Sequence, residues 1–430
     1  MRTLIQECIA GIPMIVEPAA RQEGQNPRDF ARAVARGHVV IPANPVRPHR
    51  LSAIGEGCRV KVNVNVGTSG ERCDLALERE KAEAAIANGA DTLMDLSTGG
   101  DLEAIRKMIL SFDVPVGTVP VYEAVRRAGS AVDLSADLLF TVIREHCRQG
   151  VDFLTLHCGV NREALASLKS DPRILPVVSR GGAFHVAWME RSGEENPLFS
   201  EFDYLLEILA EHEVVVSLGD GMRPGCLQDA DRHAKSVEYL NLGRLANRAL
   251  DAGVQRMIEG PGHIPFDQIG YNVRMIKELT NEAPLYLLGP LVTDIAPGYD
   301  HMVAAIGGVE ACRHGADFLC MVSPSEHLAL PLVGDIVEGT RAAKLSAHIG
   351  DLIRGKEGFR MPRERQMADA RRRLDWKEQF SLALFPDAAR AIHARDGDLD
   401  TCSMCGDLCA VKMMQEMFKD NPVLRSAAPQ

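Results

Sequence analysis

The middle of the chain repeats one pattern: a short run of β-branched residues, a polar or glycine-rich turn, and an amphipathic helical stretch. Strands that alternate with helices form parallel sheets. With roughly 25 to 40 residues per unit over about 280 residues, the pattern predicts an α/β fold in the form of a closed (β/α)8 barrel rather than an open doubly wound sheet. The candidate strands are residues 59–66, 92–96, 114–121, 153–157, 175–179, 214–218, 254–258, 285–288 and 318–322.

The candidate strands outnumber the eight places in such a barrel, so at least one of them is expected to be an extra strand or an extended loop. No G-x-G-x-x-G follows the first strand and no G-x-x-x-x-G-K-S/T occurs, which excludes the usual nucleotide-binding open sheets. We place the barrel at residues 58–345. We expect a small N-terminal domain over residues 1–57 and a C-terminal helical segment over residues 346–430.

Polar and glycine-rich segments lie at the C-terminal ends of most predicted strands, which in a barrel form the rim where chemistry takes place. Two of these loops, 179–182 and 220–225, place an arginine beside glycines. Glycine exposes backbone N–H groups and arginine adds a bidentate fork, so both loops suit a phosphate or a carboxylate. Each loop alone could be structural, because tight turns need glycine. Their joint appearance on one rim favours binding.

Three histidines, His157, His263 and His327, follow predicted strands. His263 and His327 could together bind a divalent metal, with Glu259 nearby as an acid, a base or a further ligand. In the alternative interpretation, Glu259 and His263 cap their turn and bond to the backbone. Other histidines fall in helical or charged stretches and are expected to be exposed; they are His146, His212, His233, His314, His348 and His393.

The C-terminal tail holds Cys402, Cys405 and Cys409 in a C-x2-C-x3-C run with no fourth cysteine after them. A cubane iron–sulfur cluster takes four thiolates, so three would leave one iron open to bind S-adenosylmethionine in a radical enzyme. The alternative is a structural zinc site completed by a histidine such as His393. The other cysteines are scattered through mostly apolar sequence, which predicts reduced thiols in the core.

Net charge and hydropathy limit the kinds of partner that this chain is expected to have. A net charge of −11 and a pI near 5.7 argue against a broad nucleic-acid surface. No stretch approaches the ~20 apolar residues of a membrane span. A chain of 430 residues with 46% hydrophobic residues can bury a large core. We therefore expect a cytoplasmic enzyme with neither nucleic-acid nor membrane partners.

Seven motifs in order, over about 370 residues, resemble the thiamin-pyrimidine synthase family, ThiC. They are Pro42-Ala43-Asn44, residues 61–69, 94–100, 179–182, 259–263 and 288–301, and the tail that begins at Cys402. The resemblance implies a radical S-adenosylmethionine lyase: a homodimer of barrels with a small N-terminal domain and a 4Fe-4S cluster held by the three tail cysteines.

The implied substrate is 5-aminoimidazole ribotide. The family rebuilds this ribotide into the hydroxymethylpyrimidine phosphate of thiamin, with release of formate and carbon monoxide. The reaction implies an electron donor such as flavodoxin or ferredoxin.

The resemblance also implies the roles of individual residues. Glu259 and His157 would be catalytic, Glu259 by accepting a proton from the imidazole amine during the rearrangement. His263 and His327 would hold a second metal, zinc. The residues that would line the substrate site are Asn65, Met94, Tyr122, His157, Ser179, Arg180, Gly181, Asp220, Gly221, Met222, Arg223, Glu259 and Tyr286.

Two segments, 11–25 and 45–50, depart from the family pattern. A close paralogue, 5-hydroxybenzimidazole synthase, shares nearly every motif and fragments the same ribotide to give the lower base of a cobamide. An arginine and two prolines in segment 45–50, placed near the active-site entrance, could reshape the pocket toward that product. Thiamin synthesis remains the first prediction. Alternatives from other classes are a zinc-dependent barrel lyase without radical chemistry and an iron–sulfur sensor, and the crowded rim argues against the sensor.

Overall fold

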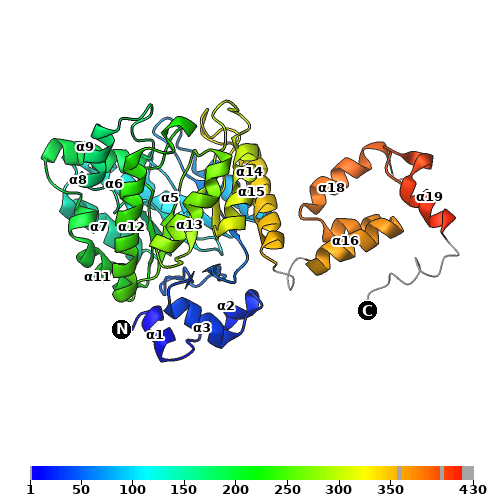
Figure 1. Cartoon of the computed structure of the whole chain (residues 1–430), viewed down its shortest axis with the longest axis horizontal. Coiled ribbons are helices and arrows are strands. Elements are labelled where there is room, and N and C mark those ends of the chain that lie inside the picture. Colours follow the sequence, from blue (N-terminus) through cyan, green and yellow to red (C-terminus); the bar gives the residue numbers. More distant parts are fainter. Residues whose placement is uncertain (1, 356–360, 398–400, 419–430) are drawn as a thin grey trace. The chain divides into compact units, whose positions relative to one another are not determined.

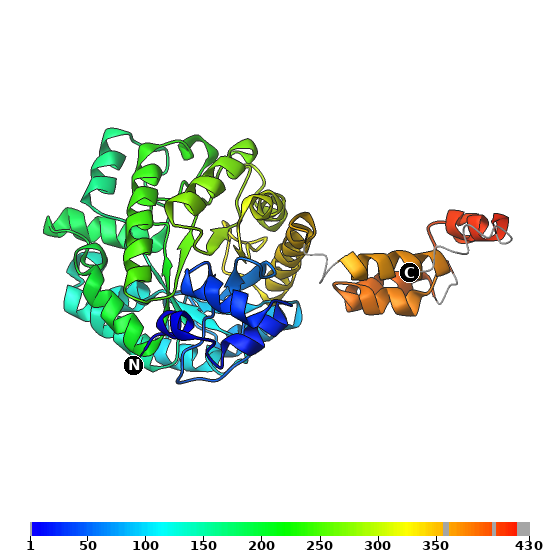
Figure 2. The same cartoon turned by 60° about the horizontal axis from the view of Figure 1, so that its bottom comes forward.

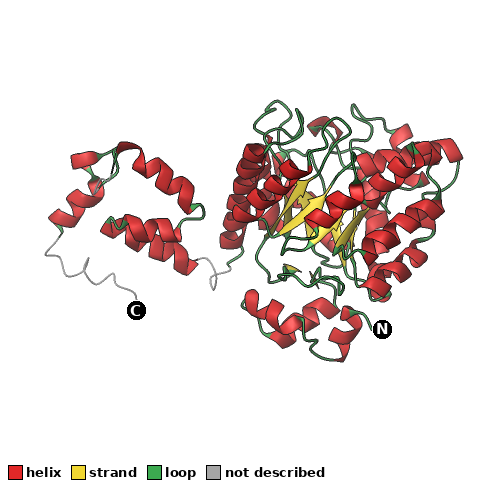
Figure 3. Cartoon of the chain, turned by 180° about the vertical axis from the view of Figure 1, so that it is seen from behind, coloured by secondary structure: helices red, strands yellow, loops and turns green. Residues whose placement is uncertain are grey.

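The computed structural model describes residues 2–355, 361–397 and 401–418, in two compact units, Met1–Arg354 and Gly355–Gln430 (Figure 1). In the first unit, parallel strands close into a barrel in the order β10-β3-β4-β5-β6-β7-β8-β9, with helices outside it (Figure 3). This confirms the predicted (β/α)8 barrel. The strands are β3 Lys61–Val66, β4 Thr92–Asp95, β5 Val116–Thr118, β6 Phe153–Leu156, β7 Val215–Leu218, β8 Arg256–Glu259, β9 Leu285–Leu288 and β10 Phe318–Cys320.

Helices connect the strands, and several begin at a polar residue that caps them. Asp74, Asp101 and Asn161 each accept a backbone N–H of the first turn that follows. The barrel helices are α4 Leu75–Ala87, α5 Leu102–Ile109, α6 Pro120–Ala128, α7 Ala136–Arg148, α8 Arg162–Ser170, α9 Arg180–Ser192, α10 Pro197–Ser200, α11 Phe202–His212, α12 His233–Asp251, α13 Ile269–Leu279, α14 Asp300–His314 and α15 Val333–Ile353. Short 3-10 turns lie at η1 Ala131–Asp133, η2 Leu227–Asp229 and η3 Phe266–Gln268.

The surplus candidate strand, residues 175–179, is an irregular segment between α8 and α9. Pro176 lacks the N–H that a strand ladder needs. The N–H groups of Ile174 and Leu175 are donated to the Asp229 carboxylate, each at 2.9 Å, so this backbone pairs with a side chain instead of a strand. The prediction of a strand here was wrong for that reason.

The N-terminal helices, blue in Figure 2, lie across the end of the barrel where the strands begin. The Leu4 N–H donates a hydrogen bond to Glu213 Oε2 at 3.0 Å, and the Ile41 N–H donates one to Gln255 Oε1 at 2.7 Å. Glu213 stands two residues before β7, and Gln255 directly precedes β8. The elements of this region are α1 Leu4–Ala10, α2 Val16–Gln22, α3 Pro27–Ala35, β1 Val39–Val40 and β2 Ile54–Gly55.

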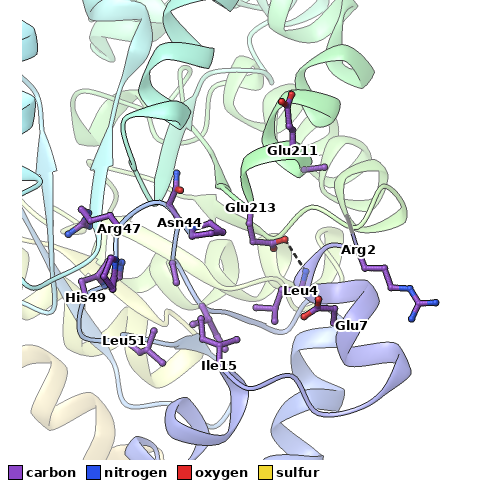
Figure 4. Close-up of a pocket in the computed structure, with 15 residues that line it drawn as sticks. Arg2, Leu4, Glu7, Ile15, Asn44, Arg47, His49, Leu51, Glu211 and Glu213 are labelled. Atoms are coloured by element: carbon purple, nitrogen blue, oxygen red, sulfur yellow. Dashed lines mark hydrogen bonds between the residues drawn. The ribbon is translucent and has the colours of Figure 1, made fainter.

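Segment 45–50 also lies at this end of the barrel, with Arg47 and His49 side by side in Figure 4. Arg47 donates to the carbonyls of Phe112 and Val114, just before β5, at 3.0 Å each. His49 Nε2 lies 2.8 Å from Asp152, just before β6. The expectation that this segment borders the active-site entrance was wrong, because the rim is formed by the opposite ends of these strands. The segment instead lines a separate cavity with residues of α1 and the turn before β7.

Two histidines that were expected to be exposed are buried: His146 and His348, at 3% and 5% exposure. His146 sits between Thr118, 2.8 Å from its Nδ1, and Glu123, 2.9 Å from its Nε2. Their position in helical sequence gave no sign of these partners. Of the scattered cysteines, all are free thiols and Cys73 alone among them is exposed.

The second unit is helical in its described part. Its elements are α16 Met361–Arg373, α17 Trp376–Leu382, α18 Pro386–His393, η4 Ala394–Asp396, η5 Gly406–Leu408 and α19 Ala410–Met417. The boundary predicted at residues 345/346 falls inside α15, and the predicted domain limits stay a prediction. Across the described residues, no helix combines the length and the apolar character that crossing a membrane requires.

Candidate active site

A cavity opens at the rim formed by the C-terminal ends of the strands. Most of the residues expected in the substrate site line it, together with several that were not expected. The lining residues are Asn65, Met94, Leu96, Val119, Tyr122, Thr155, His157, Ser179, Asp220, Arg223, Glu259, Tyr286, Leu288 and Cys320. The barrel therefore brings together side chains from six strands and from the segments that follow β4, β5, β6 and β7, as the rim of such a fold does.

Two carboxyl groups and an arginine form the polar side of this cavity. Arg223 Nη1 lies 2.8 Å from Asp220 Oδ1. Burial, reinforced by the nearby Glu259 carboxylate and opposed by Arg223, raises the pKa of Asp220 to about 8. Burial likewise raises the pKa of Glu259, whose Oε1 accepts hydrogen bonds from Thr155 at 2.8 Å and Ser217 at 3.0 Å. Two adjacent acids with raised pKa values can hold and pass a proton near neutral pH.

His157 lies at the end of β6 and is 3% exposed. Its Nδ1 finds no hydrogen-bond partner among the residues described. Burial and the neighbouring His185, whose ring centroid is 6.3 Å away, hold the pKa of His157 well below its usual range, so the ring is neutral. Gly181 leaves room for this ring, since a Cβ there would stand 2.2 Å from His157 Cε1. A neutral imidazole with a free nitrogen suits a hydrogen bond to a ligand.

The start of α9 forms an anion-binding element beside the cavity. The Ser179 hydroxyl caps the helix by accepting the Gly182 N–H at 3.2 Å. Arg180, the first residue of α9, places its guanidinium 5.0 Å from the ring centroid of Tyr122. The N–H groups of a helix N-terminus together with an arginine suit a phosphate.

Residues on strands β3, β9 and β10 supply a third group of polar atoms. Asn63 Nδ2 donates to Tyr286 Oη at 2.8 Å, and Asn65 Nδ2 to Cys320 Sγ at 3.2 Å. Burial raises the pKa of Tyr286 well above its usual range and that of Cys320 to about 12, so both are neutral at pH 7. Cys320, expected to be only a core thiol, thus borders the cavity.

Sequence reasoning missed Cys320, and it missed Thr155 and Ser217, which hold Glu259. A usable signal was present, because alternate residues of a barrel strand point inward. Thr155 stands two residues before His157, and Asn63 stands two before Asn65. Counting back two from His157 would have found Thr155, whereas Ser217 and Cys320 do not stand two residues before any residue expected in the site.

Gly221 and Met222 do not line the cavity, although they were expected in the substrate site. Met222 is fully buried. A Cβ at Gly221 would lie 2.1 Å from a Val160 methyl, so glycine lets the loop pack closely. Both residues shape the loop that carries Asp220 and Arg223.

His263 and His327 stand together at the rim, with ring centroids 5.3 Å apart. Each ring is oriented by a carboxylate through Nδ1: His263 by Asp294 at 2.7 Å and His327 by Asp300 at 2.9 Å. This arrangement leaves both Nε2 atoms available and is typical of metal-binding histidines. Burial lowers the pKa of His263 although Asp294 opposes it, which favours the neutral form that metals bind.

No third side chain joins His263 and His327 to complete a metal site: the described residues contain no group of three or more His, Cys, Asp or Glu side chains that could hold a metal ion. Glu259 does not cap its own turn with His263: its carboxylate accepts hydrogen bonds from the Thr155 and Ser217 side chains and from the backbone of Asp220, on the loop after β7. A second cavity, with a volume of about 460 Å³, runs from Asn65 past Arg180 to His327. Its size is in the range of small-molecule sites.

The tail cysteines stand on both sides of η5 Gly406–Leu408 in the second unit, with Cys402 and Cys405 before it and Cys409 after it. The N–H groups of Cys405 and Gly406 are donated to the Cys402 carbonyl at 3.3 and 3.1 Å. Partial desolvation and the adjacent Cys402 and Cys409 thiols raise the pKa of Cys405. His393, the alternative zinc ligand, packs its ring against Trp376 with centroids 4.1 Å apart.

Comparison with known proteins gives consistent matches over nearly the whole chain. The model of the radical SAM ThiC family matches residues 3–416. A protein named phosphomethylpyrimidine synthase 2 from Methanosarcina barkeri is 51% identical over 426 residues, which are 97% of this chain and 98% of the relative. Phosphomethylpyrimidine synthase 1 of Methanosarcina mazei is 52% identical over 97% of this chain and 98% of its own. The phosphomethylpyrimidine synthase of Archaeoglobus fulgidus is 50% identical, covering 97% and 99%.

Proposed function

The chain belongs to the radical SAM ThiC family, and from this premise we propose that it is a phosphomethylpyrimidine synthase. It would rearrange 5-aminoimidazole ribotide into 4-amino-5-hydroxymethyl-2-methylpyrimidine phosphate for thiamin biosynthesis. The observation that carries this proposal is the rim cavity. A neutral histidine, two acids with raised pKa values and an arginine there face a helix N-terminus that suits a phosphate.

The ribotide's phosphate would bind at the start of α9, to the Arg180 and Gly181 N–H groups and the Ser179 hydroxyl. Arg223 and Asp220 would then meet the ribose or the phosphate, and His157 Nδ1 would bond to a polar group of the aminoimidazole. Glu259 would accept a proton from the imidazole amine, because burial raises its pKa and makes the carboxylate a stronger base than an exposed glutamate. Tyr286 and Asn65 would orient the substrate on the opposite wall.

The family implies S-adenosylmethionine and an iron–sulfur cluster. A cluster held by the tail cysteines would provide one-electron reduction, the chemistry that cleavage of the carbon–sulfur bond of S-adenosylmethionine requires. Cys402, Cys405 and Cys409 fit such a cluster by their donor chemistry, because they are free thiols in a C-x2-C-x3-C run and three thiolates would leave one iron without a protein ligand. The tail would then hold a 4Fe-4S cluster, and the histidine-completed zinc site is not needed to explain the three cysteines.

His263 and His327 would hold zinc. The two neutral imidazoles, each held by an aspartate, fit this metal. The remaining positions would be taken by solvent or by S-adenosylmethionine in the second cavity, which borders His327. We also propose a cytoplasmic homodimer that receives its electron from a donor such as flavodoxin or ferredoxin.

The structure removes the observation that pointed to 5-hydroxybenzimidazole as the product. The departure that pointed to it, segment 45–50, lies at the N-terminal ends of the strands and cannot shape the rim cavity. The direct experiment is anaerobic incubation of reconstituted protein with the ribotide, S-adenosylmethionine and reductant, followed by mass analysis. Hydroxymethylpyrimidine phosphate is the expected product. Appearance of 5-hydroxybenzimidazole, or consumption of neither substrate, would overturn the proposal.

A further inference from the structure

The loop after β7 carries Asp220 and Arg223 into the cavity. Within the loop, the Arg223 N–H is donated to the Asp220 carbonyl at 3.1 Å. Around Met222 the backbone bonds instead to two buried side chains from outside the rim. The Met222 N–H is donated to Glu238 Oε2 at 2.8 Å, and the Met222 carbonyl accepts from Arg173 Nη2, also at 2.8 Å.

Glu238 lies on α12 and is fully buried. Two glycines leave room for the Glu238 side chain. A Cβ at Gly159 would stand 3.0 Å from Glu238 Cγ, and a Cβ at Gly221 would stand 3.2 Å from Glu238 Oε1. A buried carboxyl group that is confined in this way has few other positions, so the Met222 N–H that it accepts is held in one direction.

Arg173 follows α8 and is 7% exposed. Besides the Met222 carbonyl, its Nη1 lies 3.4 Å from the Arg223 carbonyl. The backbone directly after it is anchored, because the Ile174 and Leu175 N–H groups are donated to the buried Asp229 carboxylate. The hydrogen bonds to Asp229 therefore hold the backbone next to Arg173 in place, and the Arg173 side chain extends from there to the loop after β7.

We propose that Arg173 and Glu238 are positioning residues, which set the direction of Arg223 and Asp220 by holding both sides of the Met222 peptide without touching the substrate. The inference rests on the proposed function for the identity of the ligand. Both residues lie outside the cavity lining. In the cavity, the Arg223 and Asp220 side chains are joined at 2.8 Å, and Asp220 Oδ2 has no partner in the described parts of the chain. A fixed pair with one free oxygen is prepared for a ligand.

The test compares Arg173→Lys and Glu238→Gln with matched changes at the opposite end of the barrel. Arg256 is a fully buried arginine that donates to the carbonyls of Gly37 and Ala246 at 2.7 and 3.1 Å. Glu213 accepts the Leu4 N–H. Arg256→Lys and Glu213→Gln therefore make the same chemical changes where no rim residue depends on them.

Binding of 5-aminoimidazole ribotide is measured by calorimetry on the reconstituted full chain, from pH 6 to 9. We expect Arg173→Lys and Glu238→Gln to weaken binding by about tenfold or more, and to shift the inflection that Asp220 gives near pH 8. Arg256→Lys and Glu213→Gln should leave both unchanged. Uncoupled cleavage of S-adenosylmethionine should persist in all four variants.

The outcomes separate this inference from the proposed function. If the unmodified protein binds no ribotide, the proposed function fails. If it binds ribotide and both loop variants bind it with the same affinity and pH profile, the positioning role is refuted. If Arg173→Lys does not fold, Glu238→Gln decides: glutamine has nearly the size of glutamate, but one of its two terminal groups is an NH2 donor that cannot accept the Met222 N–H, so the hold on the loop is weakened. Equal loss of affinity in the control variants would also refute the role.

Discussion

Replacement of Gly181 by alanine adds one methyl group at the contact between α9 and the His157 ring. The new Cβ would stand 2.2 Å from His157 Cε1 and 2.4 Å from Nδ1. Ordinary contact begins near 3.4 Å, so the ring or the start of α9 must move by more than an ångström. The ring has little room, because a Cβ placed at Gly219, on its other side, would come within 3.0 Å of His157 Cδ2.

The energetic cost follows from two opposing terms. Gly181 is the second residue of a helix, where alanine is favoured over glycine by roughly 0.5–1 kcal/mol. Overpacking of a buried site costs about 1–3 kcal/mol. We expect a net loss of about 1–2 kcal/mol in the free energy of unfolding, and a fall of about 100-fold in kcat/KM, because a displacement of this size misplaces a group that binds the substrate.

The assay pairs urea unfolding with anaerobic turnover of 5-aminoimidazole ribotide. Gly334→Ala is the control: Gly334 is also the second residue of its helix, α15, and a Cβ there meets nothing within 4 Å. It should gain roughly 0.5–1 kcal/mol of stability and keep full activity. If Gly181→Ala keeps wild-type turnover and stability, His157 is not held by this contact and the reasoning is refuted.

Four further outcomes are expected. Alanine at any one of the tail cysteines should reduce cluster iron and abolish S-adenosylmethionine cleavage without unfolding the barrel, as measured by iron analysis and circular dichroism; a colourless, zinc-loaded wild-type tail would contradict this. The double variant His263→Ala/His327→Ala should lose bound zinc at an unchanged iron count, because thiolates hold the cluster; unchanged zinc would make both histidines structural. Arg180→Lys should weaken ribotide binding by about tenfold in calorimetry, since lysine keeps the charge but loses the fork; equal affinity would place the phosphate elsewhere. The pKa of Asp220, about 8 in the folded state, exceeds that of an unfolded aspartate. The unfolded chain therefore releases this proton first as pH rises from about 4, and the folded state loses stability up to about pH 8. Asp220→Asn should make the melting temperature fall less steeply over that range, and an unchanged slope would argue against a raised pKa.

Local patterns in the sequence were sufficient to predict the barrel fold. Alternation of β-branched runs with amphipathic stretches predicts parallel strands and their helices, and such strands place their C-terminal ends on one rim. The residues after those ends, among them Asn65, His157 and Glu259, could therefore be expected to meet before any contact was known. The ordered motifs added the family, which residue types and spacing alone could not supply.

Contacts between residues distant in the chain decided the rest. Segment 45–50 was expected near the active-site entrance, but Arg47 bonds to carbonyls that precede β5, at the other end of the barrel. Residues 175–179 had the composition of a strand. Their neighbouring N–H groups are taken by Asp229, more than fifty positions later.

The same distinction holds within the site. Which residues stand at the strand ends could be predicted from the chain alone, because that position follows from local periodicity. The tertiary structure alone decided that Thr155 and Ser217 hold Glu259, and that Arg173 and Glu238 hold the loop of Arg223. Hydrogen-bond partners and burial depend on which segments pack together, and one-dimensional patterns do not encode that packing.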